Sequence, residues 1–295
     1  MKTYDLAVIG HVSLDYNIDC RDLLTVQVGG AVVYSSAAAH ALGRSVVALT
    51  KLAPADEDRL SVFTLPREDI VCLPSSRSTS IENKYFTEDK EKRRCVCLSQ
   101  GDPFTPADIP GDISAGIWQL GGLIYGDFAE GLTDELARRG DLAVDVQGYL
   151  RHSGGEGKEM FFENWADRKR VLPSVRYLKT DAAEAEILTG LSDRRDAAKA
   201  LFDLGAREIL ITHNTEVLAY DGKEFFTCPI KARNLSGRTG RGDTTFAAYL
   251  AERMYGDIPS ALLIATATVS YKMEKTGPFD KTRADVEEYI RRFYA

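Results

Sequence analysis

Residues 236–246 read Ser-Gly-Arg-Thr-Gly-Arg-Gly-Asp-Thr-Thr-Phe, so three glycines, Gly237, Gly240 and Gly242, fall within six residues. An apolar helical run follows directly, from Phe246 to Leu250. Glycines let the backbone turn tightly and let an oxyanion approach main-chain N–H groups. The helix that follows adds unpaired N–H groups and a partial positive charge at its start. The stretch therefore predicts an anion-binding site at a helix N-terminus.

The spacing from Gly237 to Gly242 is that of a P-loop, but the residues that follow are different. A P-loop continues with Lys-Ser or Lys-Thr, whereas this chain continues with Asp243-Thr244. A carboxylate cannot neutralise a phosphate as lysine does, so the loop is not a Walker A motif. An acidic group beside an anion hole is useful if it takes a proton from an attacking hydroxyl, as phosphoryl transfer requires. The residues alone leave a second interpretation open, in which Asp243 only caps the helix.

On the N-terminal side of this loop, short apolar runs alternate with helical patterns. Such runs are typical of strands buried on both faces of a parallel sheet, so the alternation predicts an α/β protein with a doubly wound sheet flanked by helices. The predicted strands are Asp5 to Ile9, Val46 to Leu49, Ile117 to Tyr125, Leu142 to Val146, Val175 to Leu178 and Glu208 to Thr212. The predicted helices are Tyr34 to Leu42, Gly131 to Arg139, Ala182 to Leu188, Arg194 to Leu204, Asp243 to Met254, Ile258 to Met273 and Arg283 to Phe293.

Two stretches, residues 11–30 and residues 77–100, do not fit a βαβ unit. The first alternates polar and apolar residues, and the second predicts a hairpin whose turn is the charged run Glu88 to Arg94. We interpret the two together as a small β-sheet that stands off the main body as a lid, within one domain that spans residues 1–295. The alternative is that both are ordinary surface insertions.

The composition limits the partners that the chain is expected to have. Its 295 residues include 37 Lys or Arg and 44 Asp or Glu, and a net charge of -7 disfavours nucleic acid as a partner. No apolar stretch approaches the roughly 18–20 residues of a membrane helix, and no signal peptide is recognisable, so no membrane association is expected. The five cysteines are scattered and odd in number, which fits reduced thiols in a cytoplasmic protein.

Several segments, in this order, resemble the signatures of the ribokinase (PfkB) carbohydrate kinases. Residues 240–243, Gly-Arg-Gly-Asp, resemble the C-terminal G-A-G-D signature. Gly29-Gly30-Ala31, with Ala41-Leu42-Gly43 after a helical run, resembles the N-terminal signature. Residues 181–190 resemble the N-x-x-E segment, and residues 212–214, Thr-His-Asn, stand where a T-x-G helps to bind nucleotide. The chain is thus identified as a member of this family over nearly its whole length.

The resemblance implies a ribokinase-like, Rossmann-type domain with a β-sheet lid, and it implies a role for each matching residue. Asp243 would be the catalytic base, and Gly240, Arg241 and Gly242 would supply the anion hole. Glu184 would orient Mg2+ through water. Substrate hydroxyls would lie near Asp15, Gly29 and Gly30. The nucleotide would lie near Asp181, Thr212, Asn214 and Arg238.

Four of the polar residues also attract attention by themselves. Asp15 follows the first strand, and ligands bind at the carboxyl ends of strands in such sheets. Glu82 and Asn83 form a polar pair in the expected lid, where they offer acceptors and donors to substrate hydroxyls. Arg151 would contact a phosphate or the substrate. The alternatives are a solvated Asp15, a strand surface at residues 82–83 and a surface salt bridge at Arg151.

Three positions depart from the family pattern. Tyr34 stands where the family has Asn, and Asp181 replaces another Asn. Gly237-Arg238 replaces a D-T pair, which puts the family's monovalent-cation site in doubt. Arg238 and Arg241 would add positive charge at the phosphates. Within the family, the chain is most similar to bacterial myo-inositol kinases in residues 9–13, 79–85, 145–151 and 237–244.

The sequence therefore predicts a kinase that uses ATP and Mg2+ to phosphorylate a hydroxyl of a small polyol or sugar, with myo-inositol as the first choice. One alternative is a sugar or nucleoside kinase of the same family, with an aromatic platform at Tyr16, Tyr34, Tyr85 or Phe86. Another is a non-catalytic nucleotide- or sugar-binding regulator, because a fold does not fix a function. An exposed edge of the lid sheet would let two copies pair as a homodimer.

Overall fold

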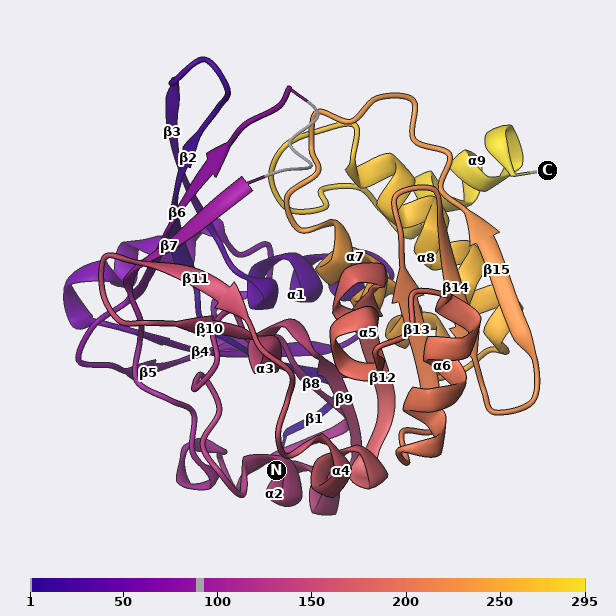
Figure 1. The fold of residues 1–295 in the computed structure, drawn as a ribbon, viewed down its shortest axis with the longest axis horizontal. Coiled ribbons are helices and arrows are strands. Elements are labelled where there is room, and N and C mark those ends of the chain that lie inside the picture. Colours follow the sequence, from indigo (N-terminus) through magenta and orange to yellow (C-terminus); the bar gives the residue numbers. More distant parts are fainter. Residues whose placement is uncertain (1, 89–92, 295) are drawn as a thin grey trace.

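The computed structural model describes residues 2–88 and 93–294. These residues form two β-sheets, and helices cover both faces of the larger sheet. The smaller sheet stands off the main body at the upper left of Figure 1. The predicted α/β class, with a doubly wound sheet and a small second sheet, is confirmed.

The larger sheet has a parallel centre. Its strands are β1 (Lys2–Ile9), β4 (Val46–Leu52), β5 (Ile70–Pro74), β8 (Ile113–Leu120), β9 (Asp141–Asp145), β12 (Val175–Asp181), β13 (Glu208–Thr212), β14 (Glu216–Tyr220) and β15 (Phe225–Pro229). They lie in the order β15-β14-β13-β12-β9-β8-β1-β4-β5, and only the pairs that involve β14 are antiparallel. The strand predicted from Ile117 to Tyr125 ends at Leu120, because Gly121 and Gly122 leave the sheet.

Each helix predicted from the sequence is present. The α-helices are α1 (Ala31–Ala41), α2 (Leu132–Arg139), α3 (Gln147–Leu150), α4 (Arg168–Val171), α5 (Ala182–Thr189), α6 (Arg194–Asp203), α7 (Arg241–Arg253), α8 (Ile258–Lys272) and α9 (Arg283–Phe293). The short 3-10 helices are η1 (Pro54–Val62), η2 (Arg67–Asp69), η3 (Pro106–Asp108) and η4 (Leu172–Ser174). Among the described residues, none of these helices has the length and apolarity that a membrane span requires.

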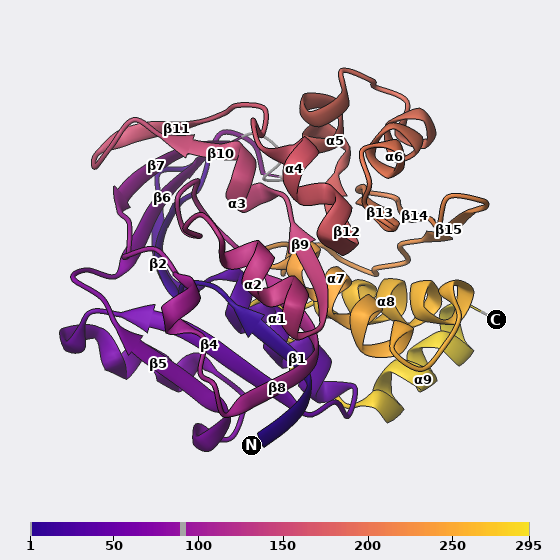
Figure 2. The ribbon, with the colours of Figure 1, turned by 90° about the horizontal axis from the view of Figure 1, so that it is seen from below.

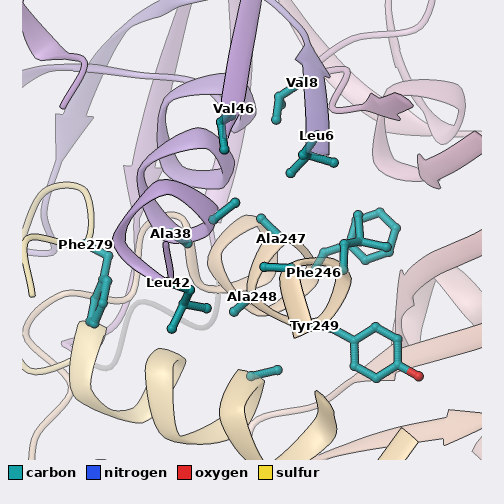
Figure 3. Packing of buried hydrophobic residues seen from close by; sticks show 14 of the residues in the cluster. Leu6, Val8, Ala38, Leu42, Val46, Phe246, Ala247, Ala248, Tyr249 and Phe279 are labelled. Atoms are coloured by element: carbon teal, nitrogen blue, oxygen red, sulfur yellow. The ribbon is translucent and has the colours of Figure 1, made fainter. Parts of the chain in front are cut away.

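The two faces of the larger sheet carry separate hydrophobic cores. Successive side chains of a strand point to opposite faces. Leu6 and Val8 of β1 therefore enter the core that contains Phe246 of α7 and Leu42, the residue after α1, as Figure 3 shows. Ala7, between them, enters the opposite core with residues of α2, α5 and α6. This packing fixes α1 and α7 against the sheet, so their N-terminal ends are held in place.

The smaller sheet, which we call the lid, has strands from both expected stretches and from a third. Its strands are β2 (Ser13–Ile18), β3 (Leu24–Gly29), β6 (Thr79–Tyr85), β7 (Arg93–Ser99), β10 (Arg151–Ser153) and β11 (Lys158–Phe162), in the order β10-β11-β7-β6-β2-β3. Figure 2 shows β10 and β11 beside β7. The sequence analysis missed β10 and β11 because a three-residue strand is too short to show a period. The predicted turn, Glu88 to Arg94, includes residues 89–92, which lie outside the described residues.

Candidate active site

The glycine-rich loop turns directly into α7. Gly240 precedes the helix with a φ of 76°, in the left-handed region that favours glycine. A Cβ added at Gly240 would lie 2.3 Å from the ring of Tyr34, so a larger residue would displace that ring. The Arg241 N–H donates to the carbonyl of Arg238 over 3.1 Å and closes the turn. The Thr244 N–H also donates to a carbonyl, that of Gly240, over 2.9 Å. In the first turn of α7, the N–H groups of Gly242 and Asp243 are therefore the ones placed to bind an anion, as the sequence predicts.

Asp243 is the acidic residue in the first turn of α7. The capping position belongs to Gly240, so the interpretation of Asp243 as the helix cap is wrong. Burial raises the pKa of the Asp243 carboxyl to about 6, and the nearby Asp145 carboxylate raises it as well. Three cations, Lys179, Lys272 and Arg151, act in the other direction and lower it. A carboxylate with a pKa near neutrality is a better base than an ordinary one and is still ionised at neutral pH.

A buried ion pair that the sequence analysis missed lies beside the anion hole. Lys179 near the end of β12 donates to both carboxylate oxygens of Asp145 at the end of β9, over 3.2 and 2.9 Å. The two side chains are only 7% and 5% exposed. A Cβ added at Gly242 would lie 2.9 Å from Lys179 Nζ, so the ammonium is next to the start of α7. The available signal was a charged residue at the carboxyl end of each of two apolar strands.

Two of the residues predicted to bind nucleotide, Asn214 and Arg238, come together with Arg241, which was predicted for the anion hole. Asn214 Oδ1 accepts hydrogen bonds from Arg241 Nη1 over 2.6 Å and from Arg238 Nη2 over 3.3 Å. This places two guanidinium groups beside the anion hole, where they add positive charge. Thr212 is not part of this group, because it is buried in the sheet and its hydroxyl donates to the carbonyl of Thr180 over 3.4 Å.

The residues predicted at the metal form the start of α5. Asp181 caps the helix by accepting from the Glu184 N–H, and Glu184 accepts from the Asp181 N–H, each over 2.8 Å. Burial raises the pKa of Glu184 to about 8, with Lys179 acting against it and the Asp181 and Asp145 carboxylates adding to it. Near neutral pH the Glu184 carboxyl is therefore mostly protonated by itself, and a nearby divalent cation would favour its ionised form.

The same residues do not form a metal cage. Among the described residues, no cluster of three His, Cys, Asp or Glu side chains is arranged to hold a metal ion directly. Mg2+ keeps several waters and is commonly held by one or two carboxylates together with substrate phosphates. A single carboxyl such as that of Glu184, together with the phosphates of a donor, would be enough to hold an Mg2+ of this kind through water.

Tyr34 lies between the anion hole and the residues predicted to bind substrate. Its ring touches Gly240, and its hydroxyl accepts a hydrogen bond from Gln27 Nε2 over 2.6 Å. A Cβ added at Gly29 would lie 3.1 Å from Asp15 Oδ2 and 3.7 Å from the Tyr34 hydroxyl oxygen. Both Asp15 and Asp243 help to raise the pKa of Tyr34, after burial itself. Asp15, Gly29 and the loop before α7 therefore all lie around the Tyr34 side chain.

The Asp15 carboxylate is suited to accept a hydrogen bond from a hydroxyl group of a ligand. Its Oδ1 is buried and has no hydrogen-bond partner among the described residues. Burial raises the pKa of this carboxyl, whereas the Arg151 and Arg93 guanidinium groups lower it. Gly30, which directly follows β3, has a φ of 112°, and a Cβ added there would lie 2.3 Å from the carbonyl oxygen of His11. Glycine is thus required where the lid strand turns into α1.

The lid contributes the remaining candidates from the face that carries Asp15. Asn83 is buried, donates to Asn17 Oδ1 over 3.1 Å and accepts from Cys95 Sγ over 3.2 Å. Arg151 at the start of β10 is 5% exposed, and its Nε donates to the carbonyl of Leu123 over 2.7 Å. The Arg151 guanidinium is close enough to Asp15 to lower the pKa of that carboxyl.

Glu82 lies on the other face of the lid. Along β6, buried and half-buried residues alternate, so Glu82 and its neighbour Asn83 point in opposite directions. Glu82 forms an ion pair with Arg94 over 3.7 Å instead. The two residues that the sequence analysis treated as a polar pair are thus separated by the pleat, and only Asn83 faces Asp15.

A buried carboxyl in the first turn of a helix after a glycine-rich loop, together with a polar lid, is typical of small-molecule kinases of the α/β class. No protein-family model matches the chain. A solved structure described as a pyrophosphate-dependent kinase in the ribokinase family, complexed with a pyrophosphate analogue and myo-inositol, is 33% identical, with a TM-score of 0.86 over 96% of this chain and 99% of that chain. The chain therefore belongs to the ribokinase family.

Two more distant relatives have the same overall extent. A cytidine kinase from Thermococcus kodakarensis is 26% identical over 254 residues, which cover 84% of this chain and 87% of the relative. The ribokinase of Arabidopsis thaliana, solved with ribose and ATP, is 15% identical, with a TM-score of 0.74 over 98% of this chain and 99% of that chain, and so shares the fold.

Proposed function

We propose that the chain transfers a phosphoryl group to a ring hydroxyl of a cyclic polyol, with myo-inositol as the acceptor and Asp243 as the general base. The observation that carries this proposal is the position of Tyr34, which touches Gly240 on one side and borders Asp15 and Gly29 on the other. This arrangement supports an acceptor site that lies next to the anion hole, as an in-line transfer requires. The 33% identical relative was solved with myo-inositol, which supports this acceptor.

The proposed reaction uses the chain's own groups in a simple order. Asp15 and Asn83 hold the hydroxyls of the polyol under the lid, and lid closure excludes water. Asp243 accepts the proton of the attacking hydroxyl as the hydroxyl oxygen bonds to the transferred phosphorus. The bond between that phosphorus and the donor's bridging oxygen breaks, and the rest of the donor leaves as orthophosphate from pyrophosphate or as ADP from ATP. The N–H groups at the start of α7 stabilise the charge that spreads over the phosphoryl oxygens. Mg2+, held as described above, would neutralise part of the donor's charge.

For the donor, we propose pyrophosphate. A donor made only of phosphate groups needs cations along its whole length, and Arg238, Arg241 and Lys179 surround the anion hole. The 33% identical relative is described as pyrophosphate-dependent. ATP, the donor expected from the sequence, is the second candidate, because Asn214 lies beside the loop at the position that the resemblance assigns to nucleotide.

The donor and the acceptor are tested in one grid. Pyrophosphate and ATP, each with Mg2+, are combined with myo-inositol, ribose, fructose and cytidine, and phosphorylated product is measured by mass spectrometry. We expect product from pyrophosphate and myo-inositol. Product only with ATP would show that ATP, and not pyrophosphate, is the donor. Product only with cytidine or a sugar would show that the acceptor is not myo-inositol. No product in any combination would favour a binding protein without activity.

The Asp15 carboxylate is expected to act mainly in binding the acceptor. Asp15→Asn keeps the shape but loses the charged acceptor, so the KM for the polyol should rise by roughly 10-fold, since a hydrogen bond to a charged group contributes about 1.5–3 kcal/mol. Glu82→Gln is the matched control on the other face of the lid and should leave the KM unchanged. Steady-state kinetics at saturating donor measure both, and equal effects of the two substitutions would contradict the assigned faces.

The pH dependence follows from the pKa of Asp243. The base must be ionised to accept a proton, so activity is absent well below its pKa and rises as the pH increases through about 6, where burial and Asp145 place that pKa. An ordinary aspartate would give a rise near 4 instead. The profile of kcat/KM for the polyol between pH 4 and 8 measures the value in the free enzyme. A flat profile over this range would exclude Asp243 as the titrating base.

A further inference from the structure

Lys272, the last residue of α8, is a buried cation that no motif of the chain pointed to. Lys272 is only 3% exposed. The ammonium donates to the carbonyl oxygen of Gly237 over 2.6 Å and also to the carbonyl oxygen of Thr239. Two carbonyls of the glycine-rich loop thus converge on one positive charge.

The loop depends on this charge because of where it is docked. The Gly237 N–H donates to the carbonyl of Met273 over 2.7 Å, at the carboxyl end of α8. A Cβ added at Gly237 would lie 1.8 Å from the carbonyl oxygen of Lys275, so the two backbones are in close contact. A helix carboxyl end carries partial negative charge. Without a cation, the carbonyls of Gly237 and Thr239 would face this negative end, and buried carbonyls that lack a partner are costly.

Lys272 is also connected to the anion hole itself. Its Nζ lies 5.1 Å from the centroid of the Tyr34 ring, and the same ring packs against Gly240. Gly240 directly follows Thr239, whose carbonyl Lys272 binds. An ammonium has three N–H donors. Two of them are used by the loop carbonyls and the group lies against an aromatic ring, so Lys272 acts on the donor through the loop.

We propose that Lys272 is a built-in monovalent cation, whose ammonium holds the loop before α7 in the conformation that binds the donor. It is a positioning residue, and it does for the two carbonyls what a bound potassium or ammonium ion would do. The enzyme therefore needs no monovalent cation from solution. The proposal rests on phosphoryl transfer at Asp243, but the loop geometry can be tested separately from turnover.

The first test uses the unmodified protein. Turnover of pyrophosphate and myo-inositol, or of the active pair found in the grid, is measured in choline, sodium, potassium and ammonium chloride at constant ionic strength. We expect rates that agree within about twofold, because the Lys272 ammonium already occupies the place of a cation. Choline is the reference salt, because large organic cations cannot enter a carbonyl site that suits a small ion. A rate that requires potassium or ammonium would overturn the proposal.

The second test removes the charge in two ways. Lys272→Ala leaves space beside the two carbonyls, whereas Lys272→Met fills that space with an uncharged chain of similar length. In choline chloride both should lose roughly 100-fold in kcat, because a loop misplaced by about 1 Å costs that much. Potassium or ammonium should restore the Ala variant and not the Met variant. Lys275→Ala is the matched control. The Lys275 side chain is exposed and its ammonium pairs with Asp280, so this variant should behave as the unmodified protein.

Thermal unfolding provides a readout that does not need turnover. Added potassium or ammonium should raise the Tm of Lys272→Ala above its value in choline, because an ion that binds only the folded state stabilises it. The same ions should leave the Tm of the unmodified protein and of Lys275→Ala unchanged. If the grid shows no kinase activity, this pattern still supports the cation role. A Lys272→Ala variant that is fully active in choline, or folded but unaffected by any small cation, would overturn it.

Discussion

Asp243→Asn is expected to reduce kcat by roughly 10²- to 10⁴-fold, the range that general-base catalysis usually contributes. Asparagine has the same shape as aspartate but cannot accept the hydroxyl proton. Donor affinity should not fall, because the substitution removes a negative charge from the vicinity of the phosphates. Folding stability should not fall either, because burial raises the pKa of Asp243 and so disfavours its ionised form in the folded protein.

The measurement combines kcat with donor affinity from isothermal titration calorimetry. Asp203→Asn, an exposed carboxylate at the end of α6, is the control for a general change of charge and should leave both unchanged. A variant at Asp243 that keeps more than about a tenth of the kcat would rule out its role as the base. A loss of donor binding without a loss of kcat would show that the carboxylate serves the binding site only.

Lys179→Met should be the most destabilising single substitution in the site. It leaves the Asp145 carboxylate, which is 5% exposed, without its charged partner. Removing one member of a buried ion pair costs about 3–5 kcal/mol of the free energy of unfolding. Turnover should fall as well, because Lys179 lies next to Gly242 and adds positive charge beside the anion hole.

The double variant Lys179→Met/Asp145→Asn separates these two effects. Asparagine removes the unpaired charge and keeps an oxygen that can accept the hydrogen bond from the Gln147 N–H, which Asp145 accepts over 3.2 Å in the unmodified protein. We expect most of the stability to return and the turnover to stay low. Urea unfolding curves and kcat measure the two quantities. A single variant within about 1 kcal/mol of the unmodified protein would contradict the account of this buried pair.

The parts of the site that lie within one continuous stretch could be predicted from the sequence. The glycines at 237, 240 and 242, the helix after them and Asp243 form one local unit, whose geometry follows from glycine conformations and helix N–H groups. The parallel sheet was also predictable, because its strands are apolar on both faces. The strand from Glu208 to Thr212 has the predicted bounds.

The contacts between distant residues could not be predicted. Lys272 and Thr239 are 33 residues apart, and Lys179 and Asp145 are 34 apart, so nothing local marks either pair. Glu82 was assigned to the site together with Asn83, as a polar pair. A pleated strand sends adjacent residues to opposite faces, and the sequence did not show which of the two points inward. Tyr34 was recognised as a departure from the family pattern and as one candidate for an aromatic platform, whereas its ring lies between Gly240 and Gly29.

The central claim is that Asp243 acts as the general base while a phosphoryl group passes directly from the donor to a ring hydroxyl at the junction of lid and loop. Phosphorus NMR of a reaction with pyrophosphate, Mg2+ and myo-inositol tests it most directly, because the spectrum separates a phosphate ester from free phosphate. We predict equal growth of a phosphomonoester signal coupled to one ring proton and of orthophosphate, with neither from Asp243→Asn. Orthophosphate alone, or an ester that forms equally well with Asp243→Asn, would contradict the account.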